Sequence, residues 1–126
     1  EDVMKLYIGG CFQGKREAVI KNENIKNIIN AENADMEEML SAESIYGIDG
    51  FIRKNLDESL VNELADRFIS ENKNVVIINN EVGYGVVPID KNERLFRELN
   101  GRFNIRIAQS SDEVYRVVSG ICTRIK

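Results

Sequence analysis

The residues Lys5-Leu-Tyr-Ile-Gly9-Gly-Cys-Phe-Gln-Gly14-Lys15-Arg16 join a short apolar run to a glycine-rich stretch with the spacing G-x-x-x-x-G-K. In a phosphate-binding loop, glycines allow consecutive backbone N–H groups to converge on an anion. The helix that follows directs its positive end to the same point, and the lysine reaches the terminal phosphates. We therefore predict a strand over residues 3–8, then a phosphate-binding loop, then a helix that begins at Lys15.

The residue after the lysine departs from the usual motif. A serine or threonine at this position supplies a hydroxyl ligand to Mg²⁺, whereas this chain has Arg16 followed by Glu17 and Ala18. The loop is thus predicted to hold phosphate but lacks the hydroxyl that places the metal, so no metal ligand is assigned. The predicted phosphate-binding residues are Gly9, Gly10, Cys11, Phe12, Gln13, Gly14, Lys15 and Arg16.

Composition sets bounds on the class of protein. The 126 residues are 43% hydrophobic and 30% charged, as expected for one globular domain over residues 1–126. A net charge of −4 gives no basic surface for nucleic acid. There is no apolar run of about 20 residues for a membrane span. With only Cys11 and Cys122 present, we expect a reducing cytoplasm rather than a disulfide framework.

Histidine is absent from the sequence. Within these residues, a Ser–His–Asp triad, a histidine metal site and a phospho- or nucleotidyl-histidine intermediate are therefore excluded. Residues 1–3 precede Met4, which we expect to be the native first residue.

Apolar runs alternate with amphipathic segments along the whole chain. Strands are predicted over residues 3–8, 25–31, 44–49, 75–78, 114–118 and 121–125, and helices over 15–22, 33–40, 55–72 and 90–108. Asp90 and Glu93 have the spacing of a capping box at the start of the last helix. This alternation predicts an α/β fold, a three-layer P-loop NTPase-like sandwich with a mostly parallel sheet.

Polar residues follow two of the predicted strands. Asp49 ends the strand over residues 44–49, where a Walker-B-type carboxylate would lie, although a helix cap or turn explains it equally well. Residues 79–88 follow the strand over residues 75–78. Because ligands bind beyond the carboxyl ends of parallel strands, we expect this stretch to lie beside the phosphate-binding loop.

Four arginines lie on the helix predicted over residues 90–108. These residues are Arg94, Arg97, Arg102 and Arg106. Either all four form a solvated face, or one or two of them reach a phosphate.

From residue 74 onward the sequence resembles the adenosylcobinamide kinase / adenosylcobinamide-phosphate guanylyltransferase family. The resemblance lies in the ordered string Asn80-Glu-Val-Gly-Tyr-Gly-Val-Val-Pro88, Arg94, Phe96, Arg97, Gly101-Arg-Phe-Asn104, Ala108, Asp112-Glu-Val, Val117-Val-Ser-Gly120 and Ile125-Lys126. Residues 8–15 are similar to the phosphate-binding loop of the same family, Gly-Gly-Ala-Arg-Ser-Gly-Lys-Ser.

The resemblance implies a P-loop fold that binds ATP or GTP at residues 9–16. It implies phosphorylation of the cobinamide hydroxyl, followed by transfer of GMP through a guanylylated histidine, in a homo-oligomer that is commonly a trimer. By similarity, Glu81 lines the active-site end of the sheet. This chain departs from the pattern in Arg16, in its lack of histidine and in a shorter stretch between the loop and residue 75.

Three functions are consistent with these residues. In the first, a reduced kinase uses Lys15 to hold the γ-phosphate and Asp49 or Glu81 to position a metal or activate the hydroxyl, so that these three are the predicted catalytic residues. In the second, a non-catalytic relative keeps nucleotide or corrinoid binding. In the third, an interaction protein carries an empty loop. We expect partners to be a nucleotide and a corrinoid, with no nucleic acid and no membrane.

Overall fold

The computed structural model describes residues 2–10, 13–81 and 90–126. Its centre is a six-stranded sheet with the order β2-β3-β4-β1-β5-β6. The strands are β1 (Lys5–Gly9), β2 (Ile28–Asn30), β3 (Ser44–Tyr46), β4 (Val76–Asn80), β5 (Glu113–Val118) and β6 (Ile121–Arg124). All neighbours pair in parallel except β6, which runs antiparallel to β5. The prediction of a mostly parallel sheet is confirmed.

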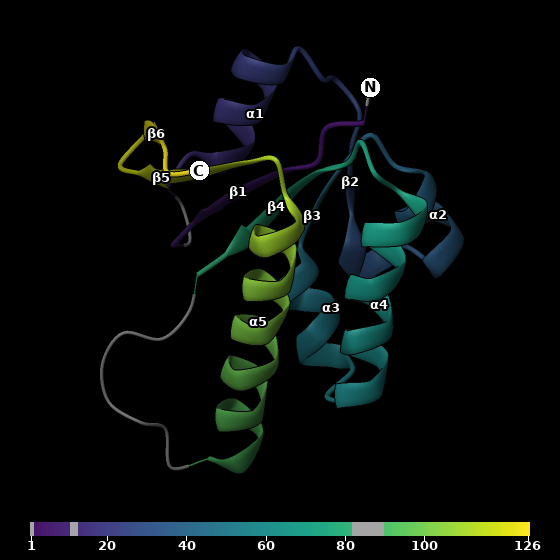
Figure 1. Ribbon diagram of the computed structural model, residues 1–126. Helices are drawn as coiled ribbons and strands as arrows, with labels where there is room; N and C mark the ends of the chain where they lie inside the picture. The colour runs from purple at the N-terminus through teal and green to yellow at the C-terminus, as the bar shows by residue number, and fades with distance from the viewer. Residues whose placement is uncertain (1, 11–12, 82–89) are drawn as a thin grey trace.

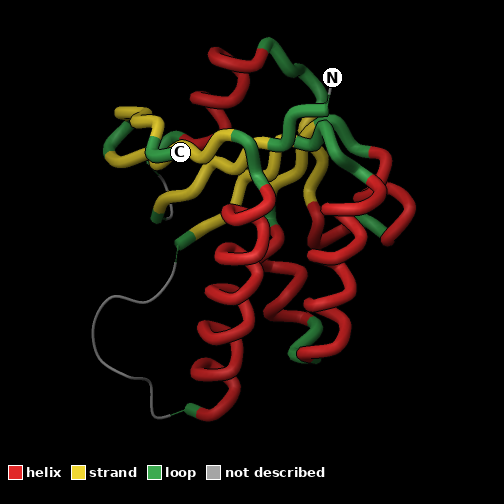
Figure 2. The backbone as a smooth tube through the Cα atoms, viewed as in Figure 1, coloured by secondary structure: helices red, strands yellow, loops and turns green. Residues whose placement is uncertain are grey.

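Helices cover both faces of this sheet (Figures 1 and 2). On one face lies α1 (Lys15–Glu23), and on the other lie α2 (Met36–Ser41), α3 (Ile48–Lys54), α4 (Glu58–Glu71) and α5 (Lys91–Ser110). A short 3-10 turn, η1 (Ala31–Asn33), follows β2. The three layers are those of the predicted P-loop NTPase-like sandwich. Among the helices of the described ranges, none combines the length and apolar character that crossing a membrane requires.

Side chains of the central strands point alternately to the two faces of the sheet, so the interior is divided into two apolar cores. Leu6 of β1 and Ile77 of β4 belong to the larger core under α3, α4 and α5, where Phe68 and Phe103 meet edge to face with ring centroids 6.3 Å apart. Tyr7 of β1 faces the opposite side. Because both faces of the central strands are buried, these strands are apolar almost throughout.

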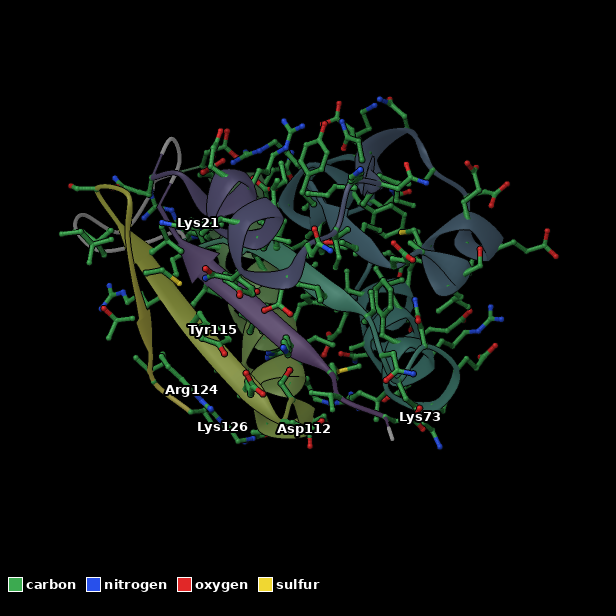
Figure 3. The ribbon with its side chains drawn as sticks, turned by 90° about the horizontal axis from the view of Figure 1, so that it is seen from above. Lys21, Lys73, Asp112, Tyr115, Arg124 and Lys126 are labelled. Carbon is green, nitrogen blue, oxygen red and sulfur yellow. The ribbon has the colours of Figure 1, made fainter. Side chains whose placement is uncertain are left out.

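The face beneath α1 has a polar margin toward β5. Tyr7 stacks on Tyr115 of β5, which is labelled in Figure 3, with ring centroids 4.6 Å apart. The Tyr7 hydroxyl donates to Glu23 at 2.6 Å, and the same carboxylate pairs with Lys5 at 2.7 Å. These contacts fix the end of α1 on β1.

The largest difference from the predicted elements follows β3. The predicted strand over residues 44–49 is wrong beyond Tyr46, because Gly47 adopts a left-handed φ of 77° and the chain then enters α3. Asp49 therefore lies in the first turn of a helix, not at the end of a strand. The helix predicted from residue 55 begins only at Glu58, where Asp57 caps it.

Two other elements are shorter than predicted. Within the stretch 25–31 only residues 28–30 form a strand. The helix expected from residue 33 starts at Met36, where Asp35 and Glu38 form a reciprocal capping box. The predicted start of the last helix is confirmed, since the Asp90 side chain accepts from the N–H groups of Asn92 and Glu93.

Candidate functional site

The glycine loop leaves the sheet at the carboxyl end of β1, between β4 and β5. Gly9 approaches β5 so closely that a Cβ atom there would lie 2.4 Å from the carbonyl oxygen of Val117. Gly14 has a φ of 88° and occupies the cap position of α1, where it offers no side-chain acceptor. Both glycines are thus required by the backbone path, and the first N–H groups of α1 are left for another acceptor.

The turn between β5 and β6 holds the loop in place. The Gly120 N–H donates to the Gln13 carbonyl oxygen at 2.9 Å, and the Ser119 N–H donates to Gln13 Oε1 at 2.5 Å. A residue inside the loop is therefore clamped through both its backbone and its side chain. Sequence reasoning missed this role of the hairpin, because the partners are more than 100 residues apart.

A cleft of about 390 Å³ opens beside the loop. Its volume lies within the range of small-molecule sites. The cleft is bounded by the start of α1 and by the carboxyl ends of β2, β3 and β4. Its lining residues are Gln13, Gly14, Lys15, Arg16, Glu17, Asn30, Glu32, Tyr46, Gly47, Asp49, Gly50, Ile78, Asn79 and Asn80.

Two cations stand side by side at the start of α1. Lys15 is 7% exposed, and its Nζ atom donates to the Gly10 carbonyl oxygen at 2.6 Å. The Arg16 guanidinium lies over the Tyr46 ring, 4.4 Å from the centroid. The positive end of α1 adds to these charges, so this wall of the cleft is suited to an anion.

Asp49 lies across the cleft and is held through β4. Its backbone N–H donates to Asn79 Oδ1 at 3.0 Å, and its Oδ2 atom accepts from Asn80 Nδ2 at 2.8 Å. The Asn80 amide therefore orients the carboxylate, and the Asn79 amide holds the backbone of the same residue.

A network of four asparagines, Asn79, Asn80, Asn100 and Asn104, connects these amides to α5. Asn79 Nδ2 donates to the side-chain oxygens of Asn100 and Asn104, at 2.9 and 2.8 Å. Asn100 and Asn104 in turn donate to the backbone carbonyl of Asn80, at 3.0 and 3.3 Å. Buried amides need such partners, and here the partners couple α5 to the residue pair that holds Asp49.

Glu81 occupies a different place. Its backbone N–H donates to the Gly9 carbonyl oxygen at 2.7 Å, and its carboxylate pairs with Arg116 of β5 at 3.2 Å. It is not among the described residues that line the cleft. Of the three predicted catalytic residues, the structure brings Lys15 and Asp49 to one cleft and sets Glu81 beside the loop, toward β5. Cys11, Phe12 and the predicted stretch 82–88 lie outside the described residues.

Sequence reasoning did not select several residues of the cleft. A Cβ atom at Gly47 would lie 2.3 Å from Asn30 Oδ1, and one at Gly50 would lie 2.3 Å from Glu32 Oε1. Asn30 and Glu32 therefore pack directly on the backbone around the start of α3. A signal was present, since Asn30 and Tyr46 each end a parallel strand, where ligand sites form.

Two of the four arginines of α5 form ion pairs at a solvated surface. Arg102 pairs with Glu58 and Glu98 at 2.7 and 2.5 Å, and Arg106 pairs with Asp66. Arg97 lies 3.9 Å from Glu93, and its Nε atom is buried. The interpretation as a solvated face is therefore favoured for Arg102 and Arg106.

The residues present do not fit the Mg²⁺ ion that this fold usually carries. In P-loop enzymes a loop hydroxyl and a Walker-B aspartate hold the metal. Here Arg16 occupies the hydroxyl position, and Asp49 Oδ2 already accepts from Asn80. Across residues 2–10, 13–81 and 90–126, no three acidic, thiol or imidazole side chains gather as metal ligands.

Comparison with known proteins identifies relatives. The bifunctional adenosylcobalamin biosynthesis protein CobU of Salmonella typhimurium is 52% identical over 52 residues, and the protein of the same name from Escherichia coli is 48% identical over 52 residues. Each match covers 41% of this chain and 29% of the relative. The matched segment thus spans less than a third of either curated relative.

A family model gives broader coverage. The model described as cobinamide kinase / cobinamide phosphate guanyltransferase matches residues 19–125. The match begins after Lys15, so the glycine loop is not part of it. It extends over far more than half of the sequence, and the chain therefore belongs to the cobinamide kinase / cobinamide phosphate guanyltransferase family.

Proposed function

We propose that this chain binds ATP or GTP in the cleft beside residues 9–16 and transfers the γ-phosphoryl group to the side-chain hydroxyl of a cobinamide. The observation that carries the proposal is the presence of Lys15 and Asp49 on one cleft at the carboxyl ends of parallel strands. Ligands of open α/β sheets bind in this position. Membership of the family supports the choice of a corrinoid as the acceptor.

The proposed reaction is a direct transfer. Lys15 and the first N–H groups of α1 hold the phosphates, while Asp49 accepts the proton of the attacking hydroxyl. The hydroxyl oxygen bonds to the γ-phosphorus, the bond from that phosphorus to the β–γ bridging oxygen breaks, and the electron pair leaves with the nucleoside diphosphate. Catalysis of this kind depends mainly on positioning and charge stabilisation. The hydrogen bonds to Asn79 and Asn80 position Asp49, and Lys15 supplies positive charge to the phosphates.

The proposal covers the kinase reaction alone. The family description names a second activity, guanylyl transfer, which the resemblance assigns to a guanylylated histidine. No histidine is present among these 126 residues to form that intermediate. We also propose, from the family resemblance, that the protein assembles as a homo-oligomer.

A second candidate is nucleotide or corrinoid binding without transfer. Arg16 favours this function, because it replaces the hydroxyl that normally places the metal beside the transferred phosphate. Glu81 favours it as well, since the ion pair with Arg116 engages its carboxylate outside the cleft.

The test combines nucleotide binding with product formation. Calorimetry with ATP and GTP is performed on the wild type, on Lys15→Ala and on Lys21→Ala, a matched control because Lys21 is exposed on the same helix. Incubation with nucleotide and cobinamide is followed by mass spectrometry for cobinamide phosphate. We expect binding and product in the wild type and the control, and loss of both in Lys15→Ala.

Other outcomes separate the candidates. Nucleotide binding without any cobinamide phosphate would leave the second candidate and remove the first. Absence of binding to either nucleotide would contradict both, and would leave a scaffold whose loop is empty and whose surface serves protein interaction. Equal affinity in Lys15→Ala and the wild type would remove the loop from the site.

A further inference from the structure

Arg16 lies where a neutral metal ligand is usual. It is the second residue of α1, adjacent to Lys15, and it lines the cleft. A guanidinium is a cation with five N–H donors and no acceptor. It therefore cannot ligate Mg²⁺, and its charge repels the ion from this part of the cleft. It is nevertheless well suited to phosphate oxygens, which it binds in a bidentate manner.

Tyr46 holds this guanidinium in the cleft. The Arg16 Cζ atom is 4.4 Å from the centroid of the Tyr46 ring, a cation–π distance. Tyr46 ends β3, lines the cleft, and packs in the same apolar cluster as Ala18 and Val19 of α1. The contact restricts the long arginine side chain but consumes none of its N–H donors, so the cation is pre-organised for an anionic ligand. The arginine itself is exposed and accessible to one.

Two carboxylates that line the cleft, Glu32 and Asp49, have contacts with other side chains. Glu32 lies 3.3 Å from Lys54, and Asp49 accepts from Asn80 at 2.8 Å. Each of these contacts uses one oxygen of its carboxylate. Metal binding at this cleft would have to overcome the charge of Arg16, which occupies the position of the usual hydroxyl ligand.

We infer that this chain binds the phosphate groups of its ligand without a divalent cation, with Arg16 supplying the positive charge that Mg²⁺ supplies in other P-loop proteins. The ligand class is a polyphosphate such as a nucleoside triphosphate, held by Lys15, Arg16 and the N-terminal end of α1. The inference rests on the nucleotide binding proposed above and applies to both candidate functions.

The experiment measures affinity with and without the metal. Calorimetry with inorganic tripolyphosphate, ATP and GTP is performed in EDTA and in MgCl₂ at matched ionic strength. In the wild type we expect the dissociation constant in EDTA to be no larger than the dissociation constant in MgCl₂. Arg16→Ala should weaken binding in EDTA by roughly tenfold or more, as expected for the loss of a charge-assisted hydrogen bond.

Three further variants isolate the role of the arginine. Tyr46→Leu should weaken binding in EDTA by roughly three- to tenfold, because the guanidinium loses the ring that orients it. Arg53→Ala is the matched control, since Arg53 also stacks on an aromatic ring, Phe96, but does not line the cleft. Its affinity should equal that of the wild type. Arg16→Ser restores the hydroxyl and should make binding depend on Mg²⁺.

The outcomes distinguish this inference from the proposed function. Binding that occurs only with Mg²⁺, or an Arg16→Ala variant that binds as tightly as the wild type in EDTA, overturns the inference and leaves nucleotide binding intact. Failure of all three ligands to bind in either buffer overturns the proposed function together with the inference. Metal-independent binding that is lost in Arg16→Ala and kept in Arg53→Ala supports both.

Discussion

Asn79 Nδ2 of β4 donates a hydrogen bond of 2.9 Å to Asn100 Oδ1 of α5, and both residues are 1% exposed. Burial of an amide is favourable only when its donors and acceptors are paired. The network meets this condition and at the same time fixes Asn80, whose amide orients Asp49. The geometry of one wall of the cleft is therefore set by a helix that does not itself line it.

Removal of one member of this network should reduce stability. Asn100→Ala removes the acceptor for one hydrogen bond from Asn79 Nδ2 and the donor of one hydrogen bond to the Asn80 carbonyl oxygen. We therefore expect the free energy of unfolding to fall by about 1–3 kcal/mol. Urea denaturation measures the change. Asn62→Ala, at an exposed position of α4, is the control and should shift the free energy by less than about 0.5 kcal/mol. Equal stability of the two variants would show that the network contributes nothing.

Gly47 should not tolerate a side chain. Its φ of 77° is unfavourable for other residues by about 1–2 kcal/mol, and a Cβ atom would meet Asn30 Oδ1 at 2.3 Å. Gly47→Ala is therefore expected to destabilise the protein by at least this amount in thermal or urea denaturation. Because Gly47 precedes α3, the change should also displace Asp49.

Substitution of Gly101 should change the stability in the opposite direction. Gly101 lies within α5, and a Cβ atom there would meet no atom of the described residues within 4 Å. Gly101→Ala should stabilise the protein by up to about 1 kcal/mol, because alanine favours the helix. If both alanine variants shifted stability in the same direction, the strain assigned to Gly47 would be incorrect.

The contact between Tyr115 and Glu113 predicts a pH dependence of stability. The hydrogen bond from the Tyr115 hydroxyl lowers the pKa of Glu113, and the same bond raises the pKa of Tyr115 to about 12. The carboxylate contribution is present above its ordinary pKa of 4.5 and is lost as the pH falls through the lowered value. The tyrosine contribution is complete below pH 10 and is lost as the pH rises toward 12.

Tyr115→Phe removes the hydroxyl and keeps the ring that stacks on Tyr7. The variant should be less stable than the wild type by about 1 kcal/mol between roughly pH 5 and 9. The difference should shrink in more acidic and more alkaline solution. Urea denaturation across this pH range is the measurement, and a spectrophotometric titration should lose one ionisation near pH 12 in the variant. A constant difference at all pH values would contradict the assignment.

Local signals were sufficient for much of the fold. The spacing of Gly9, Gly14 and Lys15 located the loop and the start of α1, and Asp90 marked the start of α5. In contrast, α3 was missed because it has only seven residues and contains Gly50, and its first apolar residue, Ile48, was assigned to the strand predicted over residues 44–49. Its start depends on the left-handed turn at Gly47, which a residue pattern does not reveal.

The cleft was predicted only in outline. Asp49 was selected because it was predicted to end a strand, where topology places ligands, but it lies in the first turn of α3. The contact of Arg16 with Tyr46 joins residues 30 positions apart, and Asn79 meets α5 more than 20 residues later. Neither pairing has a local sequence signal. Glu81 directly follows β4, but its ion pair with Arg116 depends on the position of β5.

Substitution of Asp49 by asparagine should separate catalysis from binding. The amide oxygen of Asp49→Asn can still accept from Asn80, and the bond from its backbone N–H to Asn79 is unaffected, so the fold should be retained. The variant loses the group that accepts the hydroxyl proton, and cobinamide phosphate should form about 10²–10⁴ times more slowly at saturating nucleotide. Nucleotide affinity should stay within about threefold of the wild type, since no phosphate contact is removed. Asp66→Asn, exposed on α4, is the matched control and should keep the wild-type rate. An unchanged rate in Asp49→Asn would exclude this carboxylate as the general base and leave Glu81 as the remaining predicted candidate.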